Sequence, residues 1–177
     1  MNYIGKIGYT VNDVRDMLKN HSAQLKYTVV MHTDIKRPTI KKGDYQEIQG
    51  LSDFAISNIT KRVVYFVNRF SCALYGKKSR RKNAFYKPII ISTIEGTKPQ
   101  METHTGDDST CHINLALGNI PDGIDLRATI EDCWLKAGGM NIRHNRRKPK
   151  SLNIKQLYVE PIRNVNGLLT YITKEGI

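Results

Sequence analysis

The residues best suited to chemistry lie in segment 110–121, where polar and apolar side chains alternate. Alternation predicts a β-strand, because successive side chains of a strand point to opposite faces. His112 and Asn114 then share one face, while Ile113 and Leu115 point into a core. An imidazole nitrogen beside an amide oxygen could bind a divalent cation. The alternative is a half-buried strand whose polar face has no functional role.

An acidic residue is expected to join this pair from a neighbouring strand. Residues 88–95 are nearly continuous in apolar side chains, which predicts a strand buried on both faces and ending at Glu95. The loop 96–109, rich in Gly, Thr and Asp, connects it to the next strand, and such successive strands most simply pair antiparallel. This pairing would bring Glu95 close to His112 and Asn114.

The charge of the chain favours a polyanionic partner. There are 28 Lys and Arg against 16 Asp and Glu, a net charge of +12. Because so large a charge repels itself in the compact state, nucleic acid is the first candidate partner. Cations beside aromatic rings also suit a single strand, although a solvated loop explains such runs about as often. The expected DNA-binding residues are Lys78, Arg80, Arg81, Lys82 and Tyr86 in one cluster and Arg143, Arg146, Arg147 and Lys148 in another.

The order of the expected elements predicts an α+β fold. Hydrophobic periodicity and capping residues predict helices at 10–20, 52–74, 125–137 and 164–175, and strands at 25–33, 88–95, 110–121 and 154–159. We expect an antiparallel central sheet of about four to five strands flanked by helices. The strand 25–33 should be central and end in a turn at 34–38. One domain would cover 1–177, with 1–24 as an N-terminal helical extension.

Cysteine usage and hydropathy bound the compartment. Cys72, Cys111 and Cys133 are widely spaced and form no CxxC pair, so they are expected to be reduced residues of a cytosolic protein. No apolar run approaches the ~20 residues of a membrane span, and the N-terminus lacks the apolar core of a signal peptide. Membrane and disulfide-scaffold classes are therefore not indicated.

The late helix carries the sequence Tyr171-Ile172-Thr173-Lys174, with Tyr171 and Lys174 one turn apart. Together with the element order and the strand around His112, this YxxK motif resembles the HUH endonucleases, in particular the rolling-circle replication initiators of phages and plasmids. The resemblance runs from about Leu25 to the C-terminus. In that family a strand motif of His, hydrophobic residue, His binds a divalent metal. A tyrosine on a later helix attacks a DNA phosphate.

The resemblance implies a mechanism and its residues. Tyr171 would be the nucleophile, with Lys174 favouring its phenolate form. Mg²⁺ or Mn²⁺ would be bound by His112, Asn114 and Glu95, the last at a position where several viral members place an acidic ligand. The implied fold is HUH-like, with a ferredoxin- or RRM-like arrangement. The products would be a 5′-phosphotyrosine and a free 3′-OH that can prime replication.

The implied partners follow from the same resemblance. The substrate would be single-stranded or hairpin origin DNA, and a host helicase or polymerase would act with the protein in the cytoplasm of a prokaryotic cell. The chain stops two residues after the charged last turn of its final helix, which also suits a nuclease domain taken from a longer protein.

The sequence departs from the family pattern at Asn114, where the second His usually stands. An amide oxygen still coordinates hard cations, and viral relatives carry Gln at this position, so the substitution argues against zinc rather than against metal. Glu102 and His104 in the preceding loop are reserve ligands.

Several tyrosines compete for the role of nucleophile. YxxK also begins at Tyr3 and Tyr75, but only Tyr171 follows the histidine strand by one helix and one strand. Tyr158 is the nearest rival, although its fourth-position partner is Pro161 rather than a cation.

Three other functions stay open. A single-tyrosine transposase of the same superfamily shares the histidine strand and the helix tyrosine. A relaxase would place its tyrosine near the N-terminus, which Tyr3 allows, but the chain lacks the three-histidine cluster of relaxases. A non-catalytic nucleic-acid-binding domain would explain the charge, and Asn114 keeps that hypothesis open.

Overall fold

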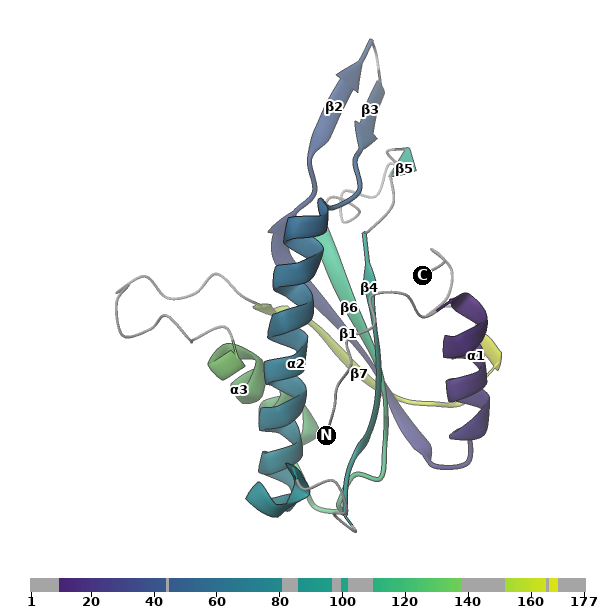
Figure 1. Ribbon diagram of the computed structural model, residues 1–177, viewed down its shortest axis with the longest axis vertical. Helices are drawn as coiled ribbons and strands as arrows, with labels where there is room; N and C mark the ends of the chain where they lie inside the picture. The colour runs from purple at the N-terminus through teal and green to yellow at the C-terminus, as the bar shows by residue number, and fades with distance from the viewer. Residues whose placement is uncertain are drawn as a thin grey trace.

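The computed structural model describes residues 10–43, 45–80, 86–96, 100–101, 110–137, 152–164 and 166–168. The chain has an α+β fold (Figure 1). The elements in order are α1 (Val11–Asn20), β1 (Leu25–Lys36), β2 (Thr39–Lys42), β3 (Tyr45–Ile48), α2 (Asp53–Tyr75), the 3-10 helix η1 (Lys77–Arg80), β4 (Ile89–Glu95), β5 (Gln100–Met101), β6 (Thr110–Gly118), α3 (Leu126–Ala137) and β7 (Leu152–Pro161). Of the expected helix at 164–175, the structure describes one helical turn at 166–168.

Four strands form the main sheet in the order β4-β6-β1-β7, and every neighbouring pair is antiparallel. The predicted antiparallel sheet and the central place of β1 are therefore confirmed. A second sheet, β2-β3-β5, extends from one end of the molecule (Figure 1).

The two faces of the main sheet are covered by different helices. Helices α2 and α3 lie on one side of the sheet and α1 lies on the other (Figure 1). We call the first side the core face, because its strand residues form the main apolar cluster with α2 and α3: Val29, Met31, Ile113, Leu115, Leu117 and Leu157. Phe66 of α2 meets Trp134 of α3 edge to face, with ring centroids 5.9 Å apart. We call the opposite side the site face.

The helices begin where their capping residues predict. Thr10 and Asp13 form a reciprocal capping box at the start of α1, with the Thr10 N–H 2.7 Å from Asp13 Oδ2. Ser52 accepts a hydrogen bond from a backbone N–H three residues on, at the start of α2. Asp125 does the same for α3. These side chains satisfy N–H groups that a helix leaves unpaired.

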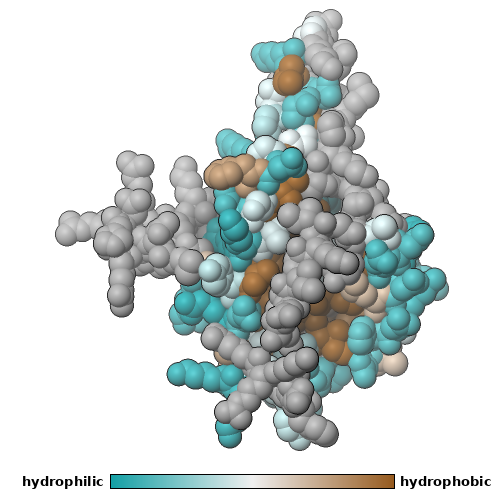
Figure 2. Space-filling view, viewed as in Figure 1, coloured by the Kyte–Doolittle hydropathy of each residue, from teal (hydrophilic) through white to brown (hydrophobic). Residues whose placement is uncertain are grey.

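Two local predictions were wrong. Within the expected turn at 34–38, residues 34–36 are instead the end of β1, and 37–38 connect it to the hairpin β2-β3, which no apolar alternation had indicated. Strand β4 is not buried on both faces, because it is an edge strand and Ser92 is exposed. Figure 2 shows hydrophobic side chains reaching the surface in the middle of this view, between more hydrophilic flanks.

Among the described residues, no helix combines the length and the hydropathy that crossing a bilayer requires.

Candidate active site

Three strands place polar side chains side by side on the site face. In the register of the sheet, Glu95 of β4 lies opposite His112 of β6, and His112 lies opposite His32 of β1. Thr93 pairs with Asn114 two residues further along the same face. Because side chains on one face of a strand recur every second residue, all five groups belong to one polar end of the site face.

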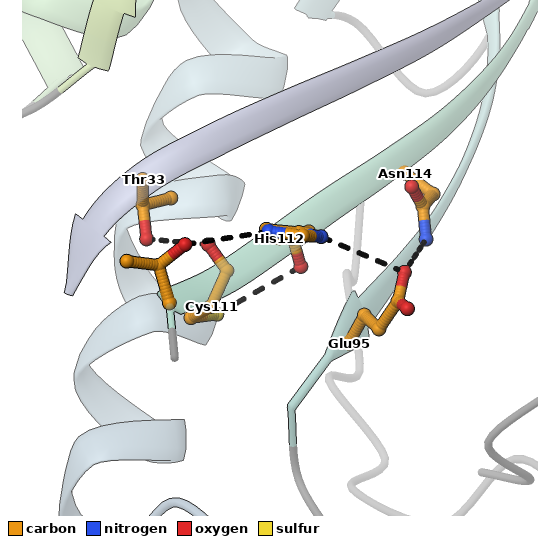
Figure 3. Close-up of polar contacts among 6 residues, drawn as sticks. Thr33, Glu95, Cys111, His112 and Asn114 are labelled. Carbon is orange, nitrogen blue, oxygen red and sulfur yellow. Dashed lines mark hydrogen bonds and ion pairs between the residues drawn. The ribbon is translucent and has the colours of Figure 1, made fainter. Parts of the chain in front are cut away.

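Glu95 joins the other two predicted metal residues. Asn114 Nδ2 donates a hydrogen bond to Glu95 Oε2 at 3.1 Å, and His112 Nδ1 lies 4.0 Å from the same oxygen (Figure 3). The expected convergence of these side chains is thus confirmed as geometry. Asn114 is 2% exposed, and the side chains of Glu95 and His112 are 12% exposed. The hydrogen bond from Asn114 satisfies one oxygen of a carboxylate that is largely shielded from solvent.

The imidazole of His112 is held on both sides. Its Nε2 lies 3.3 Å from the hydroxyl of Thr110, and its Nδ1 faces Glu95 (Figure 3). A hydrogen bond to one ring nitrogen fixes the orientation of a histidine and so determines which nitrogen faces a ligand. This arrangement leaves Nδ1 directed at the carboxylate.

Thr33 stabilises the strand where the regular pairing stops. The register of β1 with β6 shifts after His32, so the ladder hydrogen bonds are interrupted there. The Thr33 hydroxyl donates to the carbonyl of Cys111 at 2.6 Å and accepts from the N–H of Ile35 at 3.2 Å. Register irregularities of this kind commonly re-aim side chains beside functional sites.

His32 is a site residue that the sequence analysis missed. Its ring centroid lies 3.9 Å from that of His112 and 5.6 Å from that of Tyr158. The signal was present, because His32 occupies the polar face of a strand whose other face carries Val29 and Met31. The pairing of β1 with β6, which brings the two histidines together, could not be predicted from the sequence pattern.

Three buried polar atoms at this end make no hydrogen bond within the described structure: His32 Nδ1, Thr93 Oγ1 and Asn114 Oδ1. Leaving such a group unsatisfied costs about 1–3 kcal/mol, so native proteins rarely leave several together. The three atoms come from three adjacent strands and the same face. An ordered water, an ion or a ligand at this place would satisfy these groups.

The donor set fits a hard divalent cation. Glu95 and Asn114 offer oxygen and His112 offers nitrogen, a combination that suits Mg²⁺ or Mn²⁺ more than zinc. Within the described ranges, no three His, Cys, Asp or Glu side chains are grouped so that they could hold a metal ion. A metal ion here would therefore need the amide oxygen of Asn114 as a third ligand, with water completing the coordination shell.

Of the other predicted residues, those that the structure describes do not gather at this site. Lys78 and Tyr86 lie near the start of β4, whereas Glu95 ends it, and a strand of 7 residues spans about 20 Å. Arg80 lies in η1. Outside the described residues are Tyr3, Arg81, Lys82, Glu102, His104, Arg143, Arg146, Arg147, Lys148, Tyr171 and Lys174.

Tyr75 is separated from the polar end. Its hydroxyl donates to the carbonyl of Asn119 at 2.6 Å, just beyond the end of β6 that is remote from His112. Burial raises the pKa of Tyr75, which disfavours the phenolate that a nucleophile needs. The YxxK motif that begins there is therefore not part of this site.

No protein-family model matches the chain, and comparisons with curated proteins and with solved structures found no significant similarity. The functional argument accordingly depends on the geometry of the site.

Proposed function

We propose that the protein is a metal-dependent nuclease that nicks and rejoins single-stranded DNA, with Tyr171 as its nucleophile, in rolling-circle replication. The observation that carries the proposal is the convergence of Glu95, His112 and Asn114 beside unpaired buried polar atoms. An HUH-like arrangement of the sheet belongs to the same proposal. Such an enzyme would act on phage or plasmid DNA in the cytoplasm of a prokaryotic cell.

The chemistry assigns one role to each group. A divalent cation held by Glu95, His112 and Asn114 would polarise the scissile phosphate and offset charge on its oxygens. Tyrosine has a pKa near 10, so about one molecule in a thousand is phenolate at pH 7, and Lys174 would raise that fraction. The phenolate oxygen attacks phosphorus, the bond to the 3′ oxygen breaks, and that oxygen takes up a proton.

The course of the chain supports Tyr171 as the nucleophile. Leu168 is buried against Ile91 and Ala116, so the segment before Tyr171 packs on the site face. Tyr171 follows Leu168 by three residues, and three residues span at most about 11 Å. So short a connection supports the proposal that Tyr171 acts on the face that carries His112.

Adduct formation tests the nucleophile. The protein is incubated with a pool of random-sequence single-stranded oligonucleotides and Mn²⁺, and a denaturation-resistant adduct is sought on a gel. Tyr171→Phe should abolish the adduct, because it removes the attacking oxygen with little change in packing. Tyr158→Phe is the matched control, because it removes the same hydroxyl from a tyrosine whose ring meets that of His32.

The outcomes separate the hypotheses. An adduct that survives in Tyr171→Phe but disappears in Tyr158→Phe would move the nucleophile to β7. If the wild-type protein binds DNA and forms no adduct, a non-catalytic binding domain becomes the better account.

Metal binding is measured separately by calorimetric titration with MnCl₂. Glu95→Gln should weaken binding at least tenfold, because it removes the anionic ligand. Glu160→Gln is the control, since it removes the same charge from β7. Equal Mn²⁺ affinities for the two variants would show that Glu95 is not a metal ligand.

A further inference from the structure

A cavity of about 770 Å³ lies on the site face beside the candidate metal residues. Strands β1 and β7 supply Thr28, His32, Tyr158 and Glu160, and the segment that follows β7 supplies further lining. His32 belongs to both regions, because it lines the cavity and its ring lies 3.9 Å from that of His112. A molecule bound in this cavity would therefore lie next to a phosphate held at the metal centre.

The strand register gives the cavity an aromatic group. Tyr158 pairs with Val30 on β1 and is 51% exposed, so part of its ring is accessible to a ligand. The ring meets His32 edge to face, with centroids 5.6 Å apart. A half-exposed aromatic ring on a rigid strand is a platform on which an unpaired base can stack.

The same strand supplies a carboxylate two residues further along. Glu160 pairs with Thr28, is exposed, and makes no ion pair or hydrogen bond among the described residues. A carboxylate only accepts hydrogen bonds and repels phosphate. That part of the cavity therefore suits the donor-bearing edge of a base rather than the DNA backbone.

The segment that follows β7 forms one wall of the cavity, and this wall contains a fixed turn and a cationic side chain. Asn164 Oδ1 accepts from the backbone N–H of Asn166 at 2.9 Å and of Gly167 at 3.3 Å, which fixes the turn that lines the cavity. Arg163 in the same wall is exposed. A guanidinium there can contact a phosphate while the base lies deeper.

We propose that this cavity is a subsite for one unpaired nucleotide next to the scissile phosphate, with its base stacked on Tyr158 and its edge bound by Glu160. This inference rests on the proposed function, which supplies single-stranded DNA as the substrate. Guanine fits best, because its N1–H and its N2 amino group present two adjacent donors to one carboxylate. Thymine fits worst, because its single N3–H lies between two carbonyl groups.

The test uses fluorescence anisotropy with labelled 12-mers of oligothymidylate that carry one central guanine, cytosine or adenine, or none. EDTA is present, so that neither metal nor cleavage contributes. The guanine 12-mer should bind about tenfold more tightly than plain oligothymidylate, within the range that one bidentate base contact supplies. Absence of that preference would overturn the proposal.

Two variants assign the preference to its residues. Glu160→Gln should abolish the guanine preference and leave the affinity for oligothymidylate within about twofold. Tyr158→Ala should weaken binding of all four 12-mers by about tenfold, whereas Tyr158→Phe keeps the stacking surface. Glu131→Gln removes a carboxylate from α3, on the opposite side of the sheet, and should change nothing. An unaltered preference in Glu160→Gln would contradict the assignment.

Failure of this proposal can be told apart from failure of the nuclease proposal. A guanine preference that needs Glu160, in a protein that forms no covalent adduct with Mn²⁺, would support the subsite and contradict nicking. An adduct without any base preference would do the reverse.

Discussion

The two faces of the main sheet are built from the same strands, yet they carry different kinds of side chain. On the core face every inward residue of β6 is apolar and packs against α2 and α3. On the site face Ala116 packs under α1, but Asn114, two residues away, leaves its amide oxygen without a partner among the described residues. The buried polar side chains of three adjacent strands therefore distinguish this end of the site face from the apolar core face.

The core face should be the more sensitive to truncation. Phe66 is fully buried between Phe70 and Trp134, so Phe66→Ala should lower the free energy of unfolding by about 3–5 kcal/mol. Urea denaturation measures the change. Phe54→Ala in the same helix is the control, because Phe54 is 78% exposed and its loss should change stability by less than about 0.5 kcal/mol. Similar losses in both variants would contradict the described packing.

A polar change at the border of the two faces should have an intermediate effect. Thr33→Val conserves shape but removes the hydroxyl that bonds the Cys111 carbonyl, so the protein should lose about 1–3 kcal/mol of unfolding free energy. Thr39→Val replaces an exposed threonine at the start of β2 and serves as the control. If both variants unfold at the same urea concentration, the Thr33 bond does not stabilise the sheet.

The sharpest contrast compares neighbouring residues of β6. Asn114→Leu keeps the branched outline of the side chain. Loss of the hydrogen bond to Glu95 is offset by removal of an unpaired amide oxygen, so stability should change by less than about 1.5 kcal/mol while Mn²⁺ affinity is lost. Leu115→Asn puts an amide into the core face and should cost more than about 2 kcal/mol. Should Asn114→Leu destabilise the protein as much as Leu115→Asn, the amide is structural and not a ligand.

The smallest effect is expected at Tyr75. Tyr75→Phe removes one hydrogen bond to Asn119, so the unfolding free energy at pH 7 should fall by about 0.5–1.5 kcal/mol, with adduct formation unchanged. Because burial raises the pKa of Tyr75 above its ordinary value of 10.0, the native state favours the neutral phenol. This stabilisation is complete below pH 10 and is lost as the pH rises through the raised pKa.

Urea titrations at pH 9 and above check that sign. The stability of the wild-type protein should fall more steeply with pH than that of Tyr75→Phe. Parallel curves would show that the hydroxyl is solvated in the native state.

The sequence by itself determined the local elements and one edge of the site. Capping residues such as Thr10 and Ser52 specify helix starts, because they satisfy N–H groups within a few residues of themselves. The alternation in β6 places His112 and Asn114 on one face, since side-chain direction along a strand is a local property. The loop-like composition of 96–109, between β4 and β6, predicted their antiparallel pairing and with it the position of Glu95.

Only the tertiary structure decided what surrounds these residues. The place of His32 beside His112 depends on the register of β1 with β6, which pairs residues far apart in the sequence. The cavity beside Tyr158 exists because the segment after β7 folds back over the site face, and Tyr75 is distant because α2 ends at the opposite end of the sheet. Such contacts follow from which surfaces pack together, and no short stretch of sequence specifies that.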